Sequence, residues 1–300
     1  MQHNLIVITG ATGTGKTGIA ADVVRAMPTE IISCDSRQFY REMKTGTAMP
    51  STQLLREIPH HFVGHLSVTD NYSSNLFEKD VLNLLPSLFK KYGFAVMTGG
   101  SGLYIDAVTK GIDNIPDTDP EIRKHFQKRY EREGIESLRN ELKKADPVHF
   151  ARVDLQNYKR IIRALEVTAS AGRPYSSFLG QKRAGRDFRV IMTGIRRTRD
   201  DLYERINRRV DEMVAANLEE EARSLLPYRE FNALKTVGYR EFFSFFDGDI
   251  TREKAIELIK RNSRHYARRQ ETWFKKYDDM KWFTPEEKES LISYISENIR

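Results

Sequence analysis

The 300-residue chain has few of the features that mark secreted, disulfide-bonded or membrane proteins. It contains one cysteine, Cys34, which excludes an internal disulfide and a cysteine-based zinc site within one chain. No apolar run reaches the roughly 20 residues that cross a bilayer. The N-terminus enters a predicted strand without a secretory signal, and internal repeats and low-complexity tracts are absent. We therefore expect a globular protein of the cytoplasm, with no membrane partner.

Positive charge is concentrated in the middle of the chain. The net charge is +7, from 49 Lys and Arg against 42 Asp and Glu. Residues 121–200 hold 20 Lys and Arg against 10 Asp and Glu, so the rest of the chain carries −3. On charge alone two interpretations have equal weight: a surface for a large polyanionic partner, or a solvated lysine-rich surface.

A glycine-rich loop near the N-terminus gives the most specific signal. Residues 10–17 complete the pattern G-x-x-x-x-G-K-[ST], between the apolar run 5–8 and a helical pattern from Ile19. The glycines let successive N–H groups face phosphate oxygens, Lys16 reaches a terminal phosphate, and the Thr17 hydroxyl can ligate Mg²⁺. The predicted phosphate-binding residues are Gly10, Ala11, Thr12, Gly13, Thr14, Gly15, Lys16 and Thr17.

Two other strand ends should lie beside this loop. The short apolar strand 30–34 ends at Asp35, and the strand 94–98 runs into the second glycine-rich turn Gly99–Tyr104, which offers the hydroxyl of Ser101. Carboxyl ends of strands face the ligand crevice of an open α/β sheet. Three roles remain open for Asp35: a magnesium ligand, a general base facing a substrate, or a residue that only forms a turn.

The sequence predicts an all-helical, basic insertion over residues 113–195. Helical patterns follow one another over 121–133, 135–144 and 157–171, and the last begins at the N-cap residue Asn157. The flanking residues, 1–112 and 196–300, form the predicted core. Its expected class is α/β, with a P-loop NTPase-like parallel sheet flanked by helices.

Two later helices carry arginines in functional patterns. Residues Arg205, Arg208 and Arg209 suit contacts to a diphosphate, or equally ion pairs with acidic neighbours on the surface. The long helical pattern 253–276 carries a basic stripe with aromatic neighbours, which is a reasonable surface for an RNA backbone.

Together these motifs resemble the tRNA dimethylallyltransferase family of P-loop enzymes. Ala11 replaces the family's usual proline and Ser101 its usual threonine, and the length without a C-terminal zinc finger is similar to the bacterial form. The matching segments, in the family's order, are Gly10–Thr17, Asp35–Tyr40, Met43–Pro50, Pro59–His61, Gly99–Tyr104, Arg160–Val167, Val237–Arg240 and Arg268–Trp273.

The resemblance implies a reaction and roles for individual residues. A dimethylallyl group would pass from dimethylallyl diphosphate to the exocyclic amine of the adenosine 3′-adjacent to the tRNA anticodon. Asp35 would be the general base, with Ser101 and Arg209 as further catalytic residues and Mg²⁺, held by Thr17, as the cofactor. The residues implied to contact the anticodon stem-loop are Asp35, Ser36, Arg37, Gln38, Ser101, Arg123, Gln156, Asn157, Tyr158, Lys159, Arg160 and Arg163.

Three other functions share part of this pattern. A small-molecule kinase has the same loop, and a prenyltransferase of free adenine nucleotides has the same chemistry, but neither needs a basic insertion of this size. A non-catalytic RNA-binding protein with a degenerate nucleotide site would not depend on Asp35. We expect a monomer that binds tRNA and dimethylallyl diphosphate.

Overall fold

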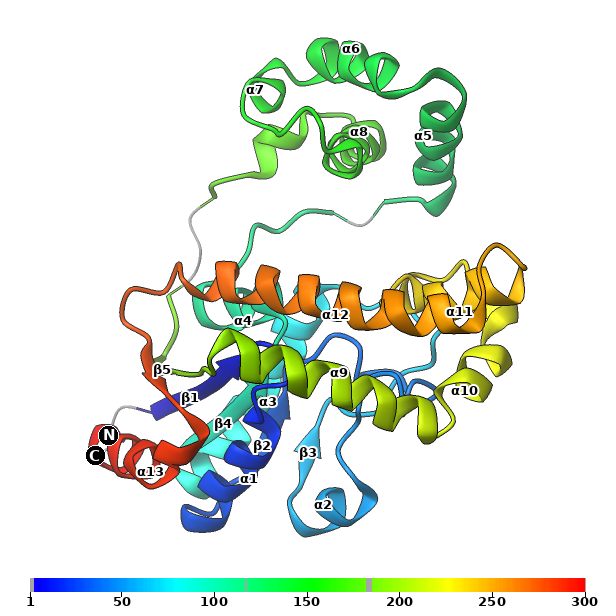
Figure 1. Ribbon diagram of the computed structural model, residues 1–300. Helices are drawn as coiled ribbons and strands as arrows, with labels where there is room; N and C mark the ends of the chain where they lie inside the picture. The colour runs from blue at the N-terminus through cyan, green and yellow to red at the C-terminus, as the bar shows by residue number, and fades with distance from the viewer. Residues whose placement is uncertain (1–2, 117, 182–184, 300) are drawn as a thin grey trace. The chain divides into compact units, whose positions relative to one another are not determined.

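The computed structural model describes residues 3–116, 118–181 and 185–299. The chain folds into two compact units, drawn in Figure 1. The core unit comprises Met1–Lys110 with Arg186–Arg300, and the inserted unit comprises Gly111–Gly185. No described helix is long and apolar enough to cross a bilayer.

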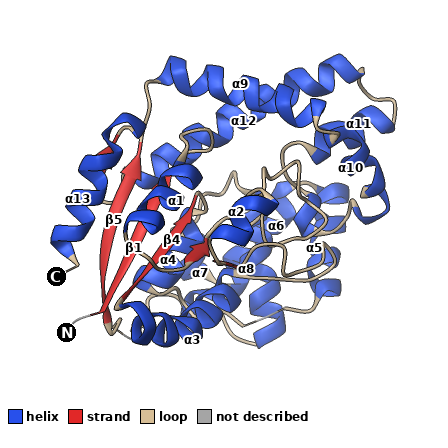
Figure 2. Cartoon of the chain, turned by 90° about the horizontal axis from the view of Figure 1, so that it is seen from below, coloured by secondary structure: helices blue, strands red, loops and turns tan. Residues whose placement is uncertain are grey.

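The core unit is built on one parallel sheet, whose strands appear in red in Figure 2. Each described pair of neighbouring strands is parallel, in the order β3-β2-β4-β1-β5-β6. The parallel α/β class is therefore confirmed. The strands are β1 (His3–Gly10), β2 (Ile31–Ser33), β3 (His60–His61), β4 (Phe94–Gly99), β5 (Phe188–Ile195) and β6 (Lys281–Phe283).

Helices cover both faces of this sheet. On β1, Leu5 and Val7 belong to the larger apolar cluster, while Ile6 and Ile8 belong to the cluster that includes α1 and α13. Successive side chains of a strand point to opposite faces, so a strand covered on both sides reads as a continuous apolar run. The helices of the core unit are α1 (Lys16–Ala26), α2 (Thr52–Glu57), α3 (Ser74–Tyr92), α4 (Gly102–Lys110), α9 (Arg199–Ala215), α10 (Leu218–Ser224), α11 (Tyr239–Phe246), α12 (Arg252–Phe274) and α13 (Lys288–Asn298).

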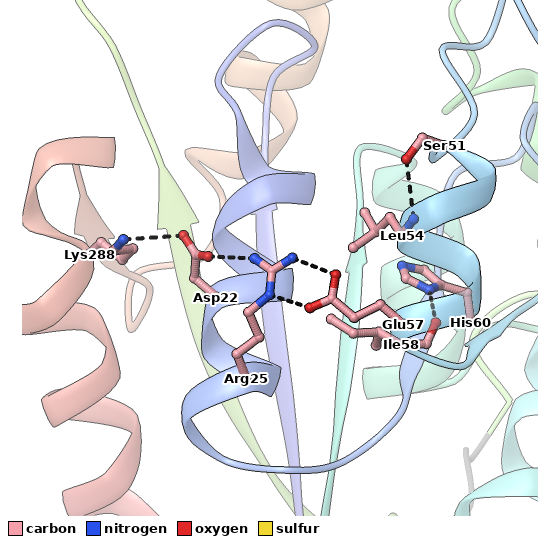
Figure 3. A network of polar contacts seen from close by, with 8 residues as sticks. All are labelled: Asp22, Arg25, Ser51, Leu54, Glu57, Ile58, His60 and Lys288. Carbon is pink, nitrogen blue, oxygen red and sulfur yellow. Dashed lines mark hydrogen bonds and ion pairs between the residues drawn. The ribbon is translucent and has the colours of Figure 1, made fainter.

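A polar network joins three of the outer helices, as Figure 3 shows. Arg25 of α1 donates to both carboxylate oxygens of Glu57 on α2, at 2.6 and 2.9 Å. It also donates to Asp22 at 2.8 Å, and Asp22 pairs with Lys288 of α13 at 3.4 Å. Exposed pairs of this kind each contribute about 0–1 kcal/mol, so the network orients the helices more than it stabilises them.

The inserted unit has an apolar centre of its own. Phe126, Leu138 and Leu142 pack against Ile161 and Leu165. Its elements are α5 (Pro120–Glu133), α6 (Ile135–Ala145), α7 (Pro147–Phe150), α8 (Tyr158–Ala171) and the 3-10 helix η1 (Tyr175–Phe178).

The predicted insertion, residues 113–195, is too long at its C-terminal end. Strand β5 lies wholly within that range, yet all of its residues pair with β1 in the core sheet. The charge changes with the boundary. Residues 111–185 carry 15 Lys and Arg against 11 Asp and Glu, a net charge of +4. The value is lower than that of the window 121–200 because residues 186–200, with five Arg and two Asp, belong to the core unit, and because residues 111–120 add three Asp.

Candidate functional site

The glycine-rich loop connects β1 to α1, and two of its glycines are required by its geometry. A Cβ atom on Gly10 would lie 2.5 Å from the carbonyl oxygen of Ile195, which the backbone cannot accommodate. Gly15 is the N-cap residue of α1, with φ of 93° in the left-handed region that favours glycine. The loop therefore closes over the positive end of α1, where an anion is stabilised.

Side chains from the loop and from the segment around α9 fix the loop's backbone. The Thr14 hydroxyl donates to the carbonyl oxygen of Ala11 at 2.9 Å. Arg205 donates to the carbonyl oxygen of Gly13 at 3.0 Å, and Arg197 to that of Thr14 at 3.1 Å. Arg205, predicted as a possible diphosphate contact, thus holds the loop in this structure.

Lys16 lies half-buried at the start of α1. Its Nζ atom donates to the carbonyl oxygen of Ala11 at 3.4 Å. Burial lowers the pKa of Lys16 to about 8, the neighbouring Arg209 lowers it further, and Asp35 opposes the shift. A bound polyanion would supply the negative charge that favours the ammonium form.

Arg209 of α9 lines the same cavity as Thr12 of the glycine-rich loop. Its guanidinium donates to the carbonyl oxygen of Thr47 at 3.4 Å. Burial lowers the pKa of Arg209, while Asp35 and Glu212 oppose the shift. Lys16, Arg209 and Asp35 therefore interact electrostatically.

Asp35 follows β2, next to a cluster of hydroxyl groups. It accepts a hydrogen bond from the backbone N–H of Arg37 at 3.1 Å. The Ser101 hydroxyl accepts from the N–H of Ser36 at 3.0 Å and lies 3.1 Å from the Ser36 hydroxyl. Tyr266 of α12 lines the cavity beside Asp35, and burial followed by the Asp35 charge raises the pKa of Tyr266 to about 12.

Two residues that were predicted to contact RNA are held by protein groups. The buried Gln38 donates to the carbonyl oxygens of Thr47 and Ala48 at 3.3 and 3.2 Å. Arg37 donates to the carbonyl oxygen of Asn232 at 3.0 Å. Both side chains therefore shape the walls of the site, and their contact with RNA stays a prediction.

Asp35, Arg37 and Arg209 line a cavity of about 380 Å³, whereas Lys16, Gln38 and Ser101 are not among its lining residues. Its polar side includes Asp35 and Arg209, and its apolar side includes Ile206, Val210 and Met213 from α9. The other lining residues are Thr12, Ser36, Gly46, Thr47, Leu218, Lys235, Thr236, Val237, Gly238, Arg240, Ile259, Ser263, Tyr266 and Arg269.

Glu221 of α10 holds one wall of the cavity, and the sequence analysis missed it. Its carboxylate accepts from the backbone N–H groups of Thr45 and Gly46 at 2.8 and 2.9 Å, and from the Tyr239 hydroxyl at 2.7 Å. A Cβ atom on Gly46 would lie 2.5 Å from that hydroxyl oxygen. The segment Met43–Pro50 was recognised as a motif, but its partner lies 175 residues away.

Gln270 of α12 was also missed. Its side-chain oxygen accepts from the N–H of Thr12 at 2.8 Å, and its side-chain nitrogen donates to the carbonyl oxygen of Gly100 at 2.8 Å. It thereby bridges the two glycine-rich turns. The pattern Arg268–Trp273 contained this glutamine, but a bond to a backbone group leaves no mark in the sequence.

In the inserted unit, two predicted RNA contacts share one buried carboxylate. Glu166 of α8 is fully buried. Arg163 donates to it at 2.7 Å, and Arg123 of α5 lies 3.4 Å away. The two arginines are partly exposed, so their remaining N–H groups can meet an anion.

The other predicted contacts gather at the start of α8. Asn157 caps the helix by accepting from the N–H of Arg160 at 3.3 Å, and Tyr158 stacks on Tyr130 with ring centres 4.2 Å apart. These two residues have structural roles. The exposed residues of the group are Gln156, Lys159 and Arg160.

The described residues hold no group of three or more His, Cys, Asp or Glu side chains placed to bind a metal ion. Within the histidine pair, His61 bonds Glu30 at 2.7 Å and His60 lies 2.7 Å from the carbonyl oxygen of Ile58. Mg²⁺ commonly has one or two protein ligands, with water and substrate phosphates for the rest. Thr17, in the first turn of α1, carries a hydroxyl oxygen of the kind that such a site would use.

Comparisons with known proteins agree on one family. The IPP transferase family model matches residues 38–277. The tRNA dimethylallyltransferase 2 of Parabacteroides distasonis is 48% identical over 298 residues, covering 99% of this chain and 100% of that protein. The tRNA dimethylallyltransferase of Christiangramia forsetii is 48% identical over 300 residues, covering 100% and 99%.

Solved structures give the same result. The tRNA isopentenylpyrophosphate transferase of Bacillus halodurans has a TM-score of 0.72 and 32% identity, covering 99% of this chain and 97% of that one. A eukaryotic dimethylallyltransferase acting on tRNA has a TM-score of 0.72 at 24% identity, covering 90% and 69%, and this likeness supports the fold alone.

Proposed function

The chain belongs to the IPP transferase family, as the sequence motifs predicted, and we propose that it prenylates tRNA. In this reaction a dimethylallyl group passes from dimethylallyl diphosphate to the exocyclic amine of the adenosine 3′-adjacent to the anticodon. Diphosphate is released, and no phosphoryl group moves.

One observation supports this proposal most directly: the composition of the cavity. A single cavity brings Asp35 and Arg209 together with the apolar side chains of Ile206, Val210 and Met213. An allylic diphosphate has the same two parts, an anionic head and a short branched hydrocarbon. A phosphoryl acceptor of a small-molecule kinase would not need the apolar wall.

The carbon–oxygen bond breaks towards the diphosphate. The amine nitrogen attacks the allylic carbon, a nitrogen–carbon bond forms, and the electron pair of the broken bond leaves with the diphosphate. Lys16, Arg209 and the N–H groups of the loop stabilise that developing charge. Mg²⁺ held by Thr17 would supply further positive charge at the diphosphate oxygens when bound.

Asp35 takes the proton that the amine loses. It lies at the cavity with Ser36 and Arg37, beside the hydroxyl cluster of Ser101. The adenine must leave the stacked anticodon loop to reach this position, as bases do in other enzymes that modify them. Ser101 then helps to hold the nucleotide.

The inserted unit is proposed to bind the anticodon arm. Lys159 and Arg160 offer exposed cations, and Arg123 and Arg163 are oriented by Glu166. RNA affinity of this kind depends on phosphate contacts and therefore weakens with salt. We further propose that the protein acts as a monomer, which sedimentation of the protein with and without RNA tests.

The decisive experiment uses labelled dimethylallyl diphosphate and an anticodon stem-loop with adenosine 3′-adjacent to the anticodon. We expect label in the RNA, and none when that adenosine is replaced by guanosine. Label transfer to free adenosine monophosphate at an equal rate would instead support the nucleotide prenyltransferase. ATP turnover on a small acceptor, without labelled RNA, would support a kinase.

A further inference from the structure

Helix α12 contacts both glycine-rich turns of the site through consecutive turns of the helix. Ala267 packs against Ala11 of the first loop, together with Leu202 and Ile206 of α9. One turn further along α12, Gln270 bonds both loops. Figure 1 shows α12 running beside α9 within the core unit.

The third contact comes one turn later. A Cβ atom on Gly102 would lie 2.3 Å from the ring of Trp273, so this turn accepts only glycine against the tryptophan. Helix α12 is therefore held against the second turn as closely as against the first. The phosphate loop and the Ser101 turn are linked through a single rigid element.

Gln270 occupies the centre of this arrangement. It is 6% exposed, and each end of its amide is used: the oxygen for Thr12 and the nitrogen for Gly100. An amide offers an acceptor and a donor a fixed distance apart, so it specifies the separation of its two partners. Buried hydrogen bonds at both ends also resist rotation of the side chain.

We propose that Gln270 is a positioning residue that sets the distance between the phosphate loop and the turn that holds the target adenosine. The inference rests on the proposed function, because it assigns the leaving group to the first loop and the nucleophile to the second. Gln270 lies outside the residues that line the cavity and acts through Thr12 and Gly100.

The expected consequence is a loss of rate rather than of binding. Bond formation requires the reacting atoms to be held about 3–3.5 Å apart, and a displacement of about 1 Å costs about 10²-fold in rate. Each substrate should still bind to its own loop with normal affinity. A positioning defect therefore lowers kcat at saturation, whereas loss of a binding contact raises KM.

The first test replaces Gln270 with methionine, which has a similar length but cannot form the two hydrogen bonds. Gln270→Met should lower kcat for prenyl transfer to the stem-loop by about 10²-fold, with both KM values within about threefold. The matched control is Gln53→Met, the same change at an exposed glutamine of α2, and it should keep full kcat.

The second test uses the close approach of Gly100 to the Gln270 amide. A Cβ atom on Gly100 would lie 2.2 Å from the Gln270 side-chain nitrogen, but 3.6 Å from the next nearest group, the carbonyl oxygen of Gly10. Gly100→Ala should displace Gln270 and lower kcat. In a Gln270→Ala background the same change should have no further effect, because the clashing atoms are gone.

Two outcomes would overturn the inference while the wild type transfers label normally. One is a Gln270→Met enzyme with wild-type kcat. The other is a double variant, Gly100→Ala with Gln270→Ala, whose loss of kcat equals the product of the losses in the two single variants. If the melting temperature of Gln270→Met falls but its kcat per folded molecule does not, the residue is structural only. A wild type that labels no RNA would refute the proposed function instead.

Discussion

At the scale of single residues, Lys16 makes substrate binding depend on pH. Its pKa is lowered to about 8, chiefly by burial, so the free site loses the ammonium charge above that pH. We expect the affinity for dimethylallyl diphosphate to be constant below about pH 8 and to fall towards tenfold per pH unit above it. Calorimetric titration from about pH 7 to about pH 9.5 measures this slope.

The control for this pH dependence is Lys16→Met, which should bind weakly at every pH in the same range. A wild-type affinity that stays flat through about pH 9.5 would contradict the lowered pKa of Lys16.

Asp35 has two proposed effects: it accepts the proton that the amine loses, and its charge favours the ammonium form of Lys16. Asp35→Asn removes the base, so we expect kcat to fall by about 10²–10⁴-fold while the stem-loop affinity stays within about threefold. Because the Asp35 charge raises the pKa of Lys16, the same change should also move the loss of diphosphate affinity to lower pH. Single-turnover rates and the binding titration, run on one preparation, measure both effects.

A functionally silent Asp35→Asn would favour the non-catalytic RNA-binding protein that the sequence left open. A normal rate combined with the shifted binding profile would leave Asp35 as an electrostatic partner of Lys16 only.

At the scale of elements, the sequence predicts best those features that a short segment of the chain determines by itself. The phosphate loop, Asp35 after β2 and the glycine turn after β4 were predicted because parallel strands bring their carboxyl ends to one edge. The short strand β6, and the helix α13 behind it, had no comparable signal. A three-residue strand is defined by its neighbour β5 rather than by its own pattern.

The side chains that hold the site were harder to predict than those that line it. Glu221 and Gln270 bond backbone groups 170 or more residues away. Every residue type has a backbone carbonyl and all but proline a backbone N–H, so no motif records the pairing. The insertion boundary failed for a related reason: β5 is recognised as core only through its register with β1.

The role of α10 in holding the cavity wall can be tested with Glu221→Gln. The charged acceptor of two N–H groups and the Tyr239 hydroxyl is lost, and we expect destabilisation of about 1–3 kcal/mol. Urea unfolding with an unchanged m-value measures it. Glu220→Gln, at an exposed position of the same helix, should stay within about 0.5 kcal/mol. Equal unfolding midpoints for the two variants would rule out this role.

At the scale of the whole molecule, net charge does not by itself identify the RNA-binding unit. The inserted unit carries +4 and the rest of the chain +3, so the excess is smaller than the window 121–200 suggested. What distinguishes the unit is the placement of its charges. Arg123 of α5 and Arg163 of α8 both pair with Glu166, and the two cations reach the surface while the acid is buried.

Replacing residues 112–184 with a short Gly/Ser linker separates the two units' functions. The ends lie close together, because Arg186 donates to the carbonyl oxygens of Ala107 and Val108 at 2.6 and 2.8 Å. The sheet and its two apolar clusters lie wholly in the core unit, so it should fold and bind dimethylallyl diphosphate as the full chain does. Affinity for the stem-loop should fall by about 10²-fold or more, with a shallower salt dependence.

A second test of RNA binding uses the double variant Lys159→Ala with Arg160→Ala in the full-length chain. Removing two single-strand phosphate contacts should reduce the slope of log affinity against log salt by about 1.4, with kcat at saturating RNA within about twofold. Lys143→Ala with Lys144→Ala, the same charge change on α6, should reduce it less. If both pairs change the slope equally, the unit attracts RNA by its net charge, and the start of α8 has no special role.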